Sequence, residues 1–307
     1  MATYLVTGGA GFIGSHLCDA LIARGDRVRV LDDLSTGKRG NLPRGAELIV
    51  GDVADPAVVR DVVAGIDGCF HLAAIASVAR GVDDWLGTHR ANLSGTVTLF
   101  DALRGRQAKV VYASSAAVYG DCPTQPITEA AATRPLSAYG ADKLGCELHA
   151  RVAAHVHGIP TVGLRFFNVY GPRQDPESPY SGVISIFCER ARNGAVFDIY
   201  GDGQQTRDFI YVADVVATLL AAMQRRTDTA AVFNVCTGVA TQVQELARTI
   251  AGLTDRRPLL RHRAARPGDV RASVGSTAAT RTALGLAPSV ALSDGLAQVL
   301  RWLDRPG

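Results

Sequence analysis

The chain lacks several features that would assign it to whole classes of protein. Its 307 residues include six cysteines but no C-x-x-C pair, only 6% aromatic residues, and no apolar run approaching the length that spans a bilayer. Basic and acidic residues are interleaved, with a formal net charge of +3. Without a basic run, the composition gives no support to nucleic-acid binding, and without a long apolar run it gives none to a membrane protein.

The widely spaced cysteines predict reduced thiols, most of them in the core, as in a cytoplasmic protein. Residues 1–14 do not resemble a signal peptide, because they have no positive first segment and glycines interrupt their apolar run. The sequence also has no metal-ligand cluster, internal repeat or low-complexity tract. The length suits two domains, or one α/β domain with a smaller lobe.

A glycine-rich turn near the start of the chain joins a short apolar strand, residues 4–6, to a helix over residues 15–25. The turn is Thr7-Gly8-Gly9-Ala10-Gly11-Phe12-Ile13-Gly14, and its glycines fit both G-x-G-x-x-G and G-x-x-G-x-x-G. Glycines allow backbone N–H groups to approach a pyrophosphate, and the helix N-terminus attracts negative charge. Strand, glycine turn and helix in this order predict the first unit of a Rossmann fold.

Further strand-like segments then alternate with helical ones, which predicts a doubly wound parallel sheet. The expected strands are Arg27–Leu31, Leu48–Val50, Cys69–Ala74, Val110–Ala113, Pro160–Arg165 and Phe233–Val235, and the expected later helices are Gln242–Leu253 and Leu292–Leu303. His71 lies within one of these strands, and we interpret it as a core histidine rather than a catalyst.

Acidic and small residues at the strand ends predict a cofactor site. Asp32, followed by Asp33, lies about twenty residues beyond the glycine turn, where an acid hydrogen-bonds the adenosine ribose. A carboxylate there repels a 2′-phosphate, which favours NAD over NADP; the simpler alternative is a strand-end turn residue. We expect Asp52 and Val53 beside the adenine, and Leu72, Ala73 and Ala74 where the cofactor passes close to the chain.

Tyr139 and Lys143 are four residues apart and would share one face of a helix. A nearby ammonium favours the phenolate form of tyrosine, which can take a proton from an alcohol. Alone, this spacing is a weak signal, because it is more typical of a solvent-facing helix pair. The upstream Ser114-Ser115 pair strengthens the catalytic interpretation, because it ends an apolar strand at the sheet edge where ligands bind.

Taken in order, the motifs TGGAGFIG, LDDLS, GDV, HLAA, YASSAAVYG, YGADK, RFFNVYGPRQDP, GDGQQTRDFIYVADV and RPGDV make the chain resemble the extended short-chain dehydrogenase/reductases. Within that family it looks like the nucleotide-sugar 4-epimerases. The resemblance implies NAD as cofactor, a UDP-sugar as substrate, a transient 4-keto intermediate and a homodimer. The expected substrates are UDP-GlcNAc and UDP-GalNAc, together with UDP-glucose and UDP-galactose. By the same resemblance, helices near residues 96–103 and 142–153 would form the dimer interface.

The resemblance also implies roles for single residues. Ser115 takes the catalytic serine position, with Ser114 as a second candidate, while Tyr139 is the base and Lys143 its partner. Asn92 and Phe166 join the cofactor contacts. The implied substrate contacts are Asn168 to the diphosphate, Arg207 and Arg266 to phosphate oxygens, Asp269 to the ribose, and Ser273 beside the sugar C2 substituent. For Arg207, an ordinary ion pair with Asp208 is the alternative.

The expected cofactor domain spans residues 1–165 and about 208–238, and the expected substrate lobe spans residues 166–207 and 239–307. Three other functions stay open. A nucleotide-sugar 4,6-dehydratase would need an acid and a base after the catalytic hydroxyl residue, where this sequence has Ala116 and Ala117. A UDP-glucuronate 4-epimerase would share the chemistry with another sugar. A non-catalytic dinucleotide sensor would not need Ser115, Tyr139 and Lys143 together.

Overall fold

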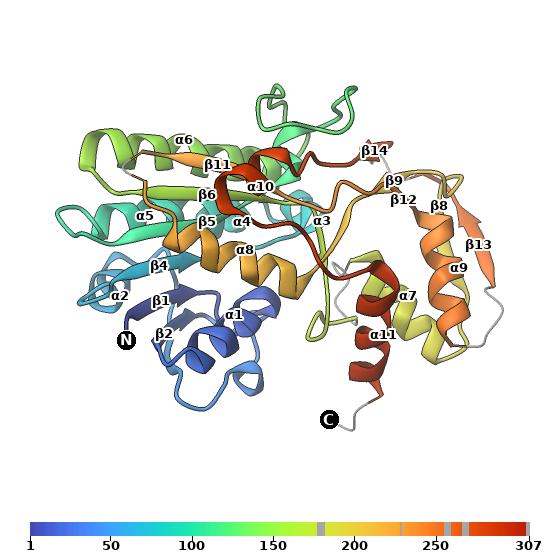
Figure 1. Ribbon diagram of the computed structural model, residues 1–307, viewed down its shortest axis with the longest axis horizontal. Helices are drawn as coiled ribbons and strands as arrows, with labels where there is room; N and C mark the ends of the chain where they lie inside the picture. The colour runs from blue at the N-terminus through green and yellow to red at the C-terminus, as the bar shows by residue number, and fades with distance from the viewer. Residues whose placement is uncertain (177–181, 228, 255–258, 266–269, 305–307) are drawn as a thin grey trace.

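The computed structural model describes residues 1–176, 182–227, 229–254, 259–265 and 270–304. Seven parallel strands form its central sheet in the order β11–β6–β5–β4–β1–β2–β3 (Figure 1). These strands are β1 Thr3–Thr7, β2 Arg27–Asp32, β3 Glu47–Val50, β4 Gly68–His71, β5 Lys109–Ser115, β6 Thr161–Phe166 and β11 Ala231–Val235. The strand order reverses between β1 and β4, as in a doubly wound Rossmann sheet. The predicted fold class is therefore confirmed.

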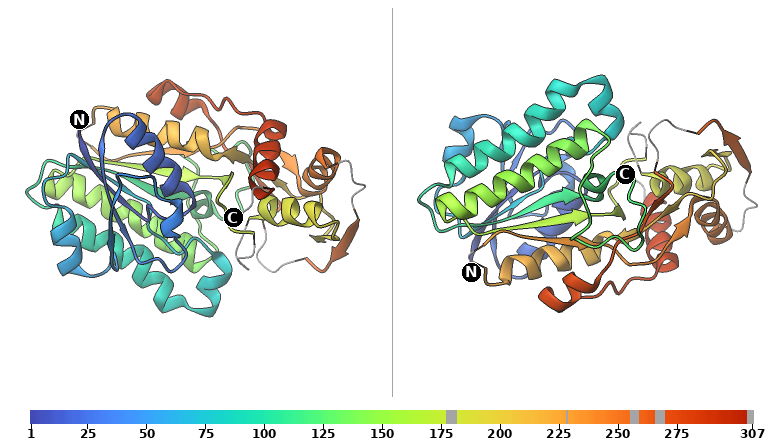
Figure 2. Two further views of the ribbon diagram at one scale, coloured as in Figure 1. Left: turned by 90° about the horizontal axis from the view of Figure 1, so that it is seen from below. Right: turned by 90° about the horizontal axis from the view of Figure 1, so that it is seen from above.

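Helices cover both faces of the sheet, and Figure 2 shows the two layers. One face packs against α1 Phe12–Ala23, α8 Val212–Gln224 and α10 Ala278–Leu284. The other packs against α2 Pro56–Val62, α5 Gly95–Ala102 and α6 Ala138–His157. Coverage on both sides explains why the central strands are mostly apolar: every residue of β4 and β6 is buried.

A second apolar core lies beside the sheet, among α7 Val183–Arg192, α9 Val243–Leu253 and α11 Leu292–Leu303 (Figure 1). The buried residues of α9 fall at positions 243, 246, 247, 250 and 251, which is the spacing of one helix face. That periodicity is the signal from which α9 and α11 were predicted. Beside these helices, β8 Phe197–Tyr200 pairs in parallel with β13 Leu260–Arg263.

Short strands connect the two cores. β7 Asn168–Tyr170 pairs with β10 Phe209–Tyr211, while β9 Thr206–Arg207 lies between β12 Thr241–Gln242 and β14 Ala272–Ser273. Figure 1 places β9, β12 and β14 between the central sheet and the helices of the second core. The predicted domain boundaries stay a prediction; residues 278–284 of the predicted lobe form α10, which packs on the central sheet.

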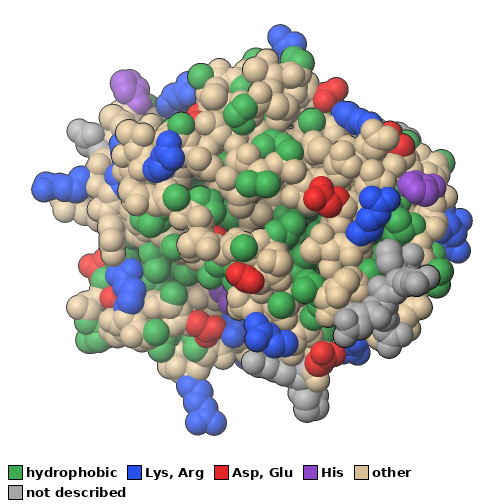
Figure 3. Space-filling view, turned by 45° about the vertical axis from the view of Figure 1, so that its right-hand side comes forward, with side chains coloured by type: hydrophobic (Ala, Val, Ile, Leu, Met, Phe, Trp, Pro, Cys, Tyr) green, Lys and Arg blue, Asp and Glu red, His purple; other side chains and the backbone are tan. Residues whose placement is uncertain are grey.

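The sheet's carboxyl edge is lined by short helical segments. They are α3 Val78–Asp83, α4 Trp85–His89, a π-helix over Arg90–Ser94, and 3-10 turns at Arg39–Asn41 and Ala116–Tyr119. The π-helix leads directly into α5, which begins at Gly95. Figure 3 shows basic and acidic side chains interspersed over one face of the molecule. In the described ranges, no helix is both long and apolar enough to cross a membrane.

Candidate active site

The glycine turn between β1 and α1 is built so closely that side chains are excluded at two positions. Gly8 has φ +69°, and a Cβ there would lie 2.7 Å from Ala73 N. A Cβ on Gly14 would lie 2.2 Å from the Gly8 carbonyl oxygen. The turn therefore presents bare backbone where β1 ends and α1 begins, which fits a bound pyrophosphate.

A cavity of about 320 Å³ opens at this turn, along the carboxyl ends of β1, β2, β4 and β5. The predicted cofactor residues that line it are Gly8, Gly11, Phe12, Ile13, Gly14, Asp32, Asp33, Asp52, Val53, Leu72, Ala73, Ala74, Tyr139, Lys143 and Phe166. Segments as distant as residues 8 and 166 thus share one wall. Their shared groove, with the glycine turn at one end, has the layout that a dinucleotide requires.

Some lining residues were missed by the sequence reasoning. They include Ser35, Thr36, Ser77, Arg80 and Ala91. Ser35 and Thr36 directly follow Asp33 in the loop after β2, so their place in the chain was an available signal. Arg80 and Ala91 belong to the α3–π-helix segment, which has no periodic pattern of its own.

Asp32 links the end of β2 to the glycine turn. Its Oδ2 accepts from Ala10 N and its Oδ1 from Leu34 N, both at 2.9 Å. The side chain is buried, and burial raises the pKa of its carboxyl. A carboxylate can accept about four hydrogen bonds, so capacity for ribose hydroxyls is left. Asp32 is thus both the strand-end turn residue and a candidate ribose contact.

Asn92 lies behind the cavity wall and does not line it. Its side-chain Oδ1 accepts from Ile75 N at 2.8 Å, and its Nδ2 donates to Ile75 O at 3.3 Å. The Asn92 amide is therefore engaged with the backbone of Ile75, which does line the cavity. A π-helix at residues 90–94 sets this amide in place, as π-helical turns often do near functional sites.

Tyr139 and Lys143 lie on the first turns of α6, which Ser137 caps by accepting from Gly140 N. Lys143 Nζ is 5.9 Å from the Tyr139 ring centroid and donates to Ala113 O at 2.9 Å. An ammonium has three donors, so this bond leaves two. Among the described residues the Tyr139 hydroxyl makes no hydrogen bond, although Tyr139 lines the cavity. These two side chains are therefore neighbours on the cavity wall, as predicted, with polar atoms still available.

The structure separates the two candidate serines at the end of β5. Ser114 lines the cavity, but its hydroxyl donates to Glu147 Oε1 at 2.5 Å. Ser115 does not line the cavity; its Oγ accepts from Ala117 N at 3.1 Å and so caps the turn at residues 116–119. Among the described residues, Ser115 donates no hydrogen bond. The hydroxyl proton still available to a substrate is therefore that of Ser115.

His71 is held between two threonines inside the sheet. Its Nδ1 lies 2.7 Å from Thr7 Oγ1 and its Nε2 lies 3.0 Å from Thr96 Oγ1. Burial, together with the positive charge of Lys143, lowers the pKa of the imidazole to about 3. His71 is therefore neutral and does not line the cavity, as expected of a core histidine.

The predicted substrate residues meet on the short connecting strands. Ser273 of β14 pairs with Arg207 of β9, and Asn168 of β7 pairs with Phe209 of β10, two residues beyond Arg207. Arg207 donates to Thr206 O at 2.8 Å. None of Asn168, Arg207 and Ser273 lines the cofactor cavity. Arg266 and Asp269 lie outside the described residues.

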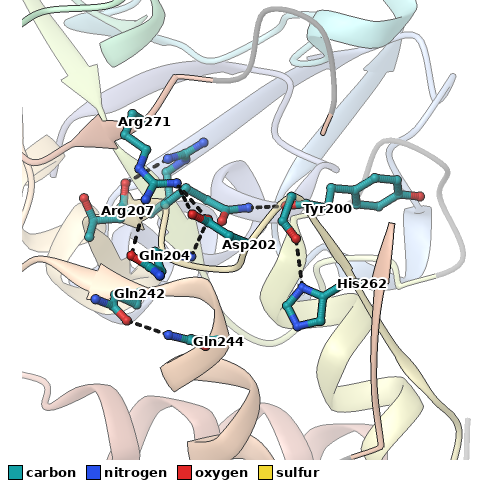
Figure 4. Close-up of polar contacts among 11 residues, drawn as sticks. Tyr200, Asp202, Gln204, Arg207, Gln242, Gln244, His262 and Arg271 are labelled. Carbon is teal, nitrogen blue, oxygen red and sulfur yellow. Dashed lines mark hydrogen bonds and ion pairs between the residues drawn. The ribbon is translucent and has the colours of Figure 1, made fainter. Parts of the chain in front are cut away.

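The polar side chains around Arg207 come from neighbouring strands and turns. Figure 4 shows Arg207 with Arg271, Asp202 and Gln204. Arg271 Nη1 donates to both Asp202 oxygens, at 2.7 and 2.9 Å. The buried Asp208 carboxylate instead accepts from the backbone N–H groups of residues 237, 238 and 275. The Asp208 carboxylate is thus engaged in holding these backbone turns, and among the described residues no ion pair joins it to Arg207.

Comparison with known proteins adds three observations. Residues 4–236 match the model of the NAD dependent epimerase/dehydratase family. A UDP-glucose 4-epimerase of Mycolicibacterium smegmatis is 38% identical, over 97% of each chain. Two solved structures, each covering 98% of both chains, also match. They are a UDP-N-acetylglucosamine 4-epimerase from Methanobrevibacter ruminantium in complex with UDP-N-acetylmuramic acid (TM-score 0.94, 34% identity) and a UDP-glucose 4-epimerase of Thermus thermophilus in complex with NAD (TM-score 0.91, 35% identity).

Proposed function

The chain belongs to the NAD dependent epimerase/dehydratase family, and from this membership we propose that it is a C4 epimerase of UDP-sugars. Its cofactor is NAD. The proposed reaction interconverts UDP-GlcNAc with UDP-GalNAc and also UDP-glucose with UDP-galactose. The observation that carries the proposal is the position of Tyr139 and Lys143 on the wall of a dinucleotide cavity, close to the end of β5 that delivers Ser115.

When bound, NAD supplies a hydride acceptor and donor for carbon C4 of the sugar. Tyr139, whose side-chain oxygen has no other partner among the described residues, acts as a phenolate: it takes the C4 hydroxyl proton and later returns it. Lys143 is held by Ala113 O, and its remaining N–H donors would hold the nicotinamide ribose. The Ser115 hydroxyl donates a hydrogen bond to the C4 oxygen, which stabilises charge that develops there. The 4-keto sugar turns within the site while its diphosphate stays bound.

The residues after Ser115 favour epimerisation over dehydration. Loss of water across C5 and C6 needs one group to donate a proton and another to take one. Ala116 and Ala117 occupy the first positions of the turn that Ser115 caps, and a methyl side chain can do neither. With no acid or base at these positions, the 4-keto sugar is reduced again rather than dehydrated.

Ser273 is the basis for proposing N-acetylated substrates. Its side chain is small, and its strand β14 pairs with β9, which carries Arg207. By the resemblance to the nucleotide-sugar 4-epimerases, this position borders the C2 substituent of the turning sugar, so a tyrosine here would collide with an acetamido group. A serine leaves room for that group without excluding a hydroxyl, since an oversized pocket discriminates weakly against a smaller group.

Incubating the purified protein with each of five UDP-sugars, without added NAD, tests the function. The substrates are UDP-glucose, UDP-galactose, UDP-GlcNAc and UDP-GalNAc, with UDP-glucuronate as a fifth, and NMR identifies the products. The proposal predicts C4-inverted product from both pairs. A 4-keto-6-deoxy product would indicate a dehydratase, inversion of UDP-glucuronate alone would indicate the glucuronate enzyme, and no reaction with any sugar would favour a sensor.

The same assay tests the pocket through Ser273→Tyr, with Ser273→Ala as the matched control. Ser273→Ala keeps the space and should keep both activities. Ser273→Tyr should lose the N-acetyl reaction and retain part of the glucose/galactose exchange. Full N-acetyl activity in Ser273→Tyr, or none in the wild type, would contradict the role given to Ser273.

The proposed assembly is a homodimer formed through α5 and α6. Leu148, Val152 and Val156 follow one another at four-residue spacing on α6 and are 52%, 50% and 63% exposed, and Val97 of the adjacent α5 is 37% exposed. Aliphatic side chains in a row on one helix face are typical of a helix–helix contact. Val152→Glu should therefore convert a dimer to a monomer in sedimentation analysis; a monomeric wild type would contradict the assembly.

A further inference from the structure

A buried ion pair lies one helical turn beyond Lys143. Glu147 follows Lys143 by four residues on α6, so both side chains leave the same face of the helix. Arg165 of β6 donates to both Glu147 oxygens, from Nε at 2.8 Å and from Nη2 at 2.7 Å. Each of the two side chains is only 7% exposed, and neither lines the cofactor cavity. The pair therefore lies behind the reaction site rather than inside it.

The pair contacts the chain on both sides of Ser115. On one side, Ser114 Oγ donates to Glu147 Oε1 at 2.5 Å. On the other, Tyr119 ends the turn that Ser115 caps, and its hydroxyl accepts from Arg165 Nη1 at 2.8 Å. The Arg165 guanidinium also lies 4.7 Å from the Tyr119 ring centroid. Ser115 is thus held between two residues that are each fixed by the same ion pair.

The hydrogen bonds continue from Tyr119 into the last strand of the sheet. The Tyr119 hydroxyl donates to Asn234 Oδ1 at 2.6 Å, and Asn234 Nδ2 donates to Ile127 O at 2.9 Å. One connected set of buried hydrogen bonds therefore joins α6, β5, β6 and β11 around the turn that carries Ser115. In such a network each bond restrains the others, so the turn has little freedom to shift.

We propose that Glu147 and Arg165 are positioning residues that hold the Ser115 turn against α6 and so set the Ser115 hydroxyl relative to Tyr139. This inference rests on the proposed epimerase function, in which those two hydroxyls act on one sugar oxygen. Stability alone gives little reason for the pair, since apolar residues of similar volume often replace a buried ion pair without loss. Precise positioning of the Ser115 hydroxyl is a stronger reason, because moving a catalytic group by about 1 Å can lower the rate about 100-fold.

The double variant Glu147→Leu/Arg165→Met tests the inference. It removes both charges together and leaves no lone buried charge. The matched control is Thr161→Val, which removes a buried bond between the same helix and the first residue of the same strand, from Thr161 Oγ1 to Ala150 O at 3.3 Å. The double variant should lower kcat about 10- to 100-fold. Its KM for UDP-sugar and its bound NAD should stay at wild-type values, as should kcat in the control.

Ser114→Ala is the second variant, because it cuts one link and leaves the ion pair intact. It should lower kcat less than the double variant does. If the double variant does not fold, the kcat of Ser114→Ala by itself tests whether the network positions Ser115. Wild-type kcat in both folded variants, or a kcat loss in Ser114→Ala that comes with an equal rise in KM, would overturn the positioning role.

Crystal structures of the wild type and the variants separate this inference from the proposed function. The inference predicts that Ser115 Oγ is displaced relative to Tyr139 in the variants and unmoved in Thr161→Val. An unmoved Ser115 in both Ser114→Ala and the double variant would overturn the positioning role, whatever the activity. An inactive wild type would instead refute the epimerase function, and the displacement of Ser115 would still be measured.

Discussion

Gly14→Ala should weaken NAD binding without unfolding the protein. A Cβ at this position would lie 2.2 Å from the Gly8 carbonyl oxygen, 2.7 Å from Gly9 Cα and 2.9 Å from the Gly8 carbonyl carbon. All three are backbone atoms, so no side chain can rotate away and the glycine turn itself must move. Overpacking of this kind typically costs about 1–3 kcal/mol. If bound NAD requires the original turn, its Kd should rise about 5- to 150-fold.

The assay is calorimetric titration of NAD into protein stripped of nucleotide, together with the amount of nucleotide that remains bound after purification. Gly252→Ala is the matched control, since a Cβ at Gly252 in α9 meets nothing within 4 Å. The control should bind NAD like the wild type. Wild-type affinity in Gly14→Ala would refute the argument that backbone contact at this turn holds the cofactor.

Three further predictions concern the base, the cofactor and acid stability. Tyr139→Phe should leave the fold and bound NAD intact and lower kcat about 10²–10⁴-fold, as expected for loss of a general base; near-normal turnover would remove Tyr139 from the mechanism. Nucleotide released by denaturation should be NAD, because Asp32 repels a 2′-phosphate; mainly NADP would refute the role of Asp32. Below pH 6.5 the unfolded chain takes up a proton at His71, whereas the folded protein does so only near pH 3. Between pH 6.5 and pH 3, protonation of His71 in the unfolded chain should therefore lower the free energy of unfolding by about 1.4 kcal/mol for each unit that the pH falls. Urea denaturation should show that the unfolding free energy of His71→Gln falls less steeply than that of the wild type between about pH 6 and pH 4. Equal slopes in the two proteins would contradict the buried, neutral state of His71.

Features encoded by local patterns were predictable from the sequence. The glycine turn, the apolar strands and the helices α9 and α11 each have a spacing set by their own backbone geometry. The carboxyl ends of parallel strands meet at one edge, so the positions of Asp32, Asp52 and Ala73 at strand ends were enough to assign them to one cavity.

Features that depend on distant pairing were not predictable. Strands β9, β12 and β14 have only two residues each, too few to show periodicity, and they form by pairing across long stretches of chain. Asn92 was expected to contact the cofactor, but a π-helix directs its amide to the backbone of Ile75. The contact between Ser114 and Glu147 likewise joins a strand end to a helix, and neither local sequence indicates it.

The central claim is that hydrogen leaves C4 of the sugar and returns to the same carbon from the opposite face. UDP-galactose deuterated at C4 tests it directly, with mass spectrometry and NMR of the UDP-glucose produced without added NAD. The account predicts that the product keeps its deuterium at C4. Inverted product with ordinary hydrogen at C4 would mean that a proton from solvent had replaced the deuterium, and would contradict the mechanism assigned to Tyr139, Lys143 and Ser115.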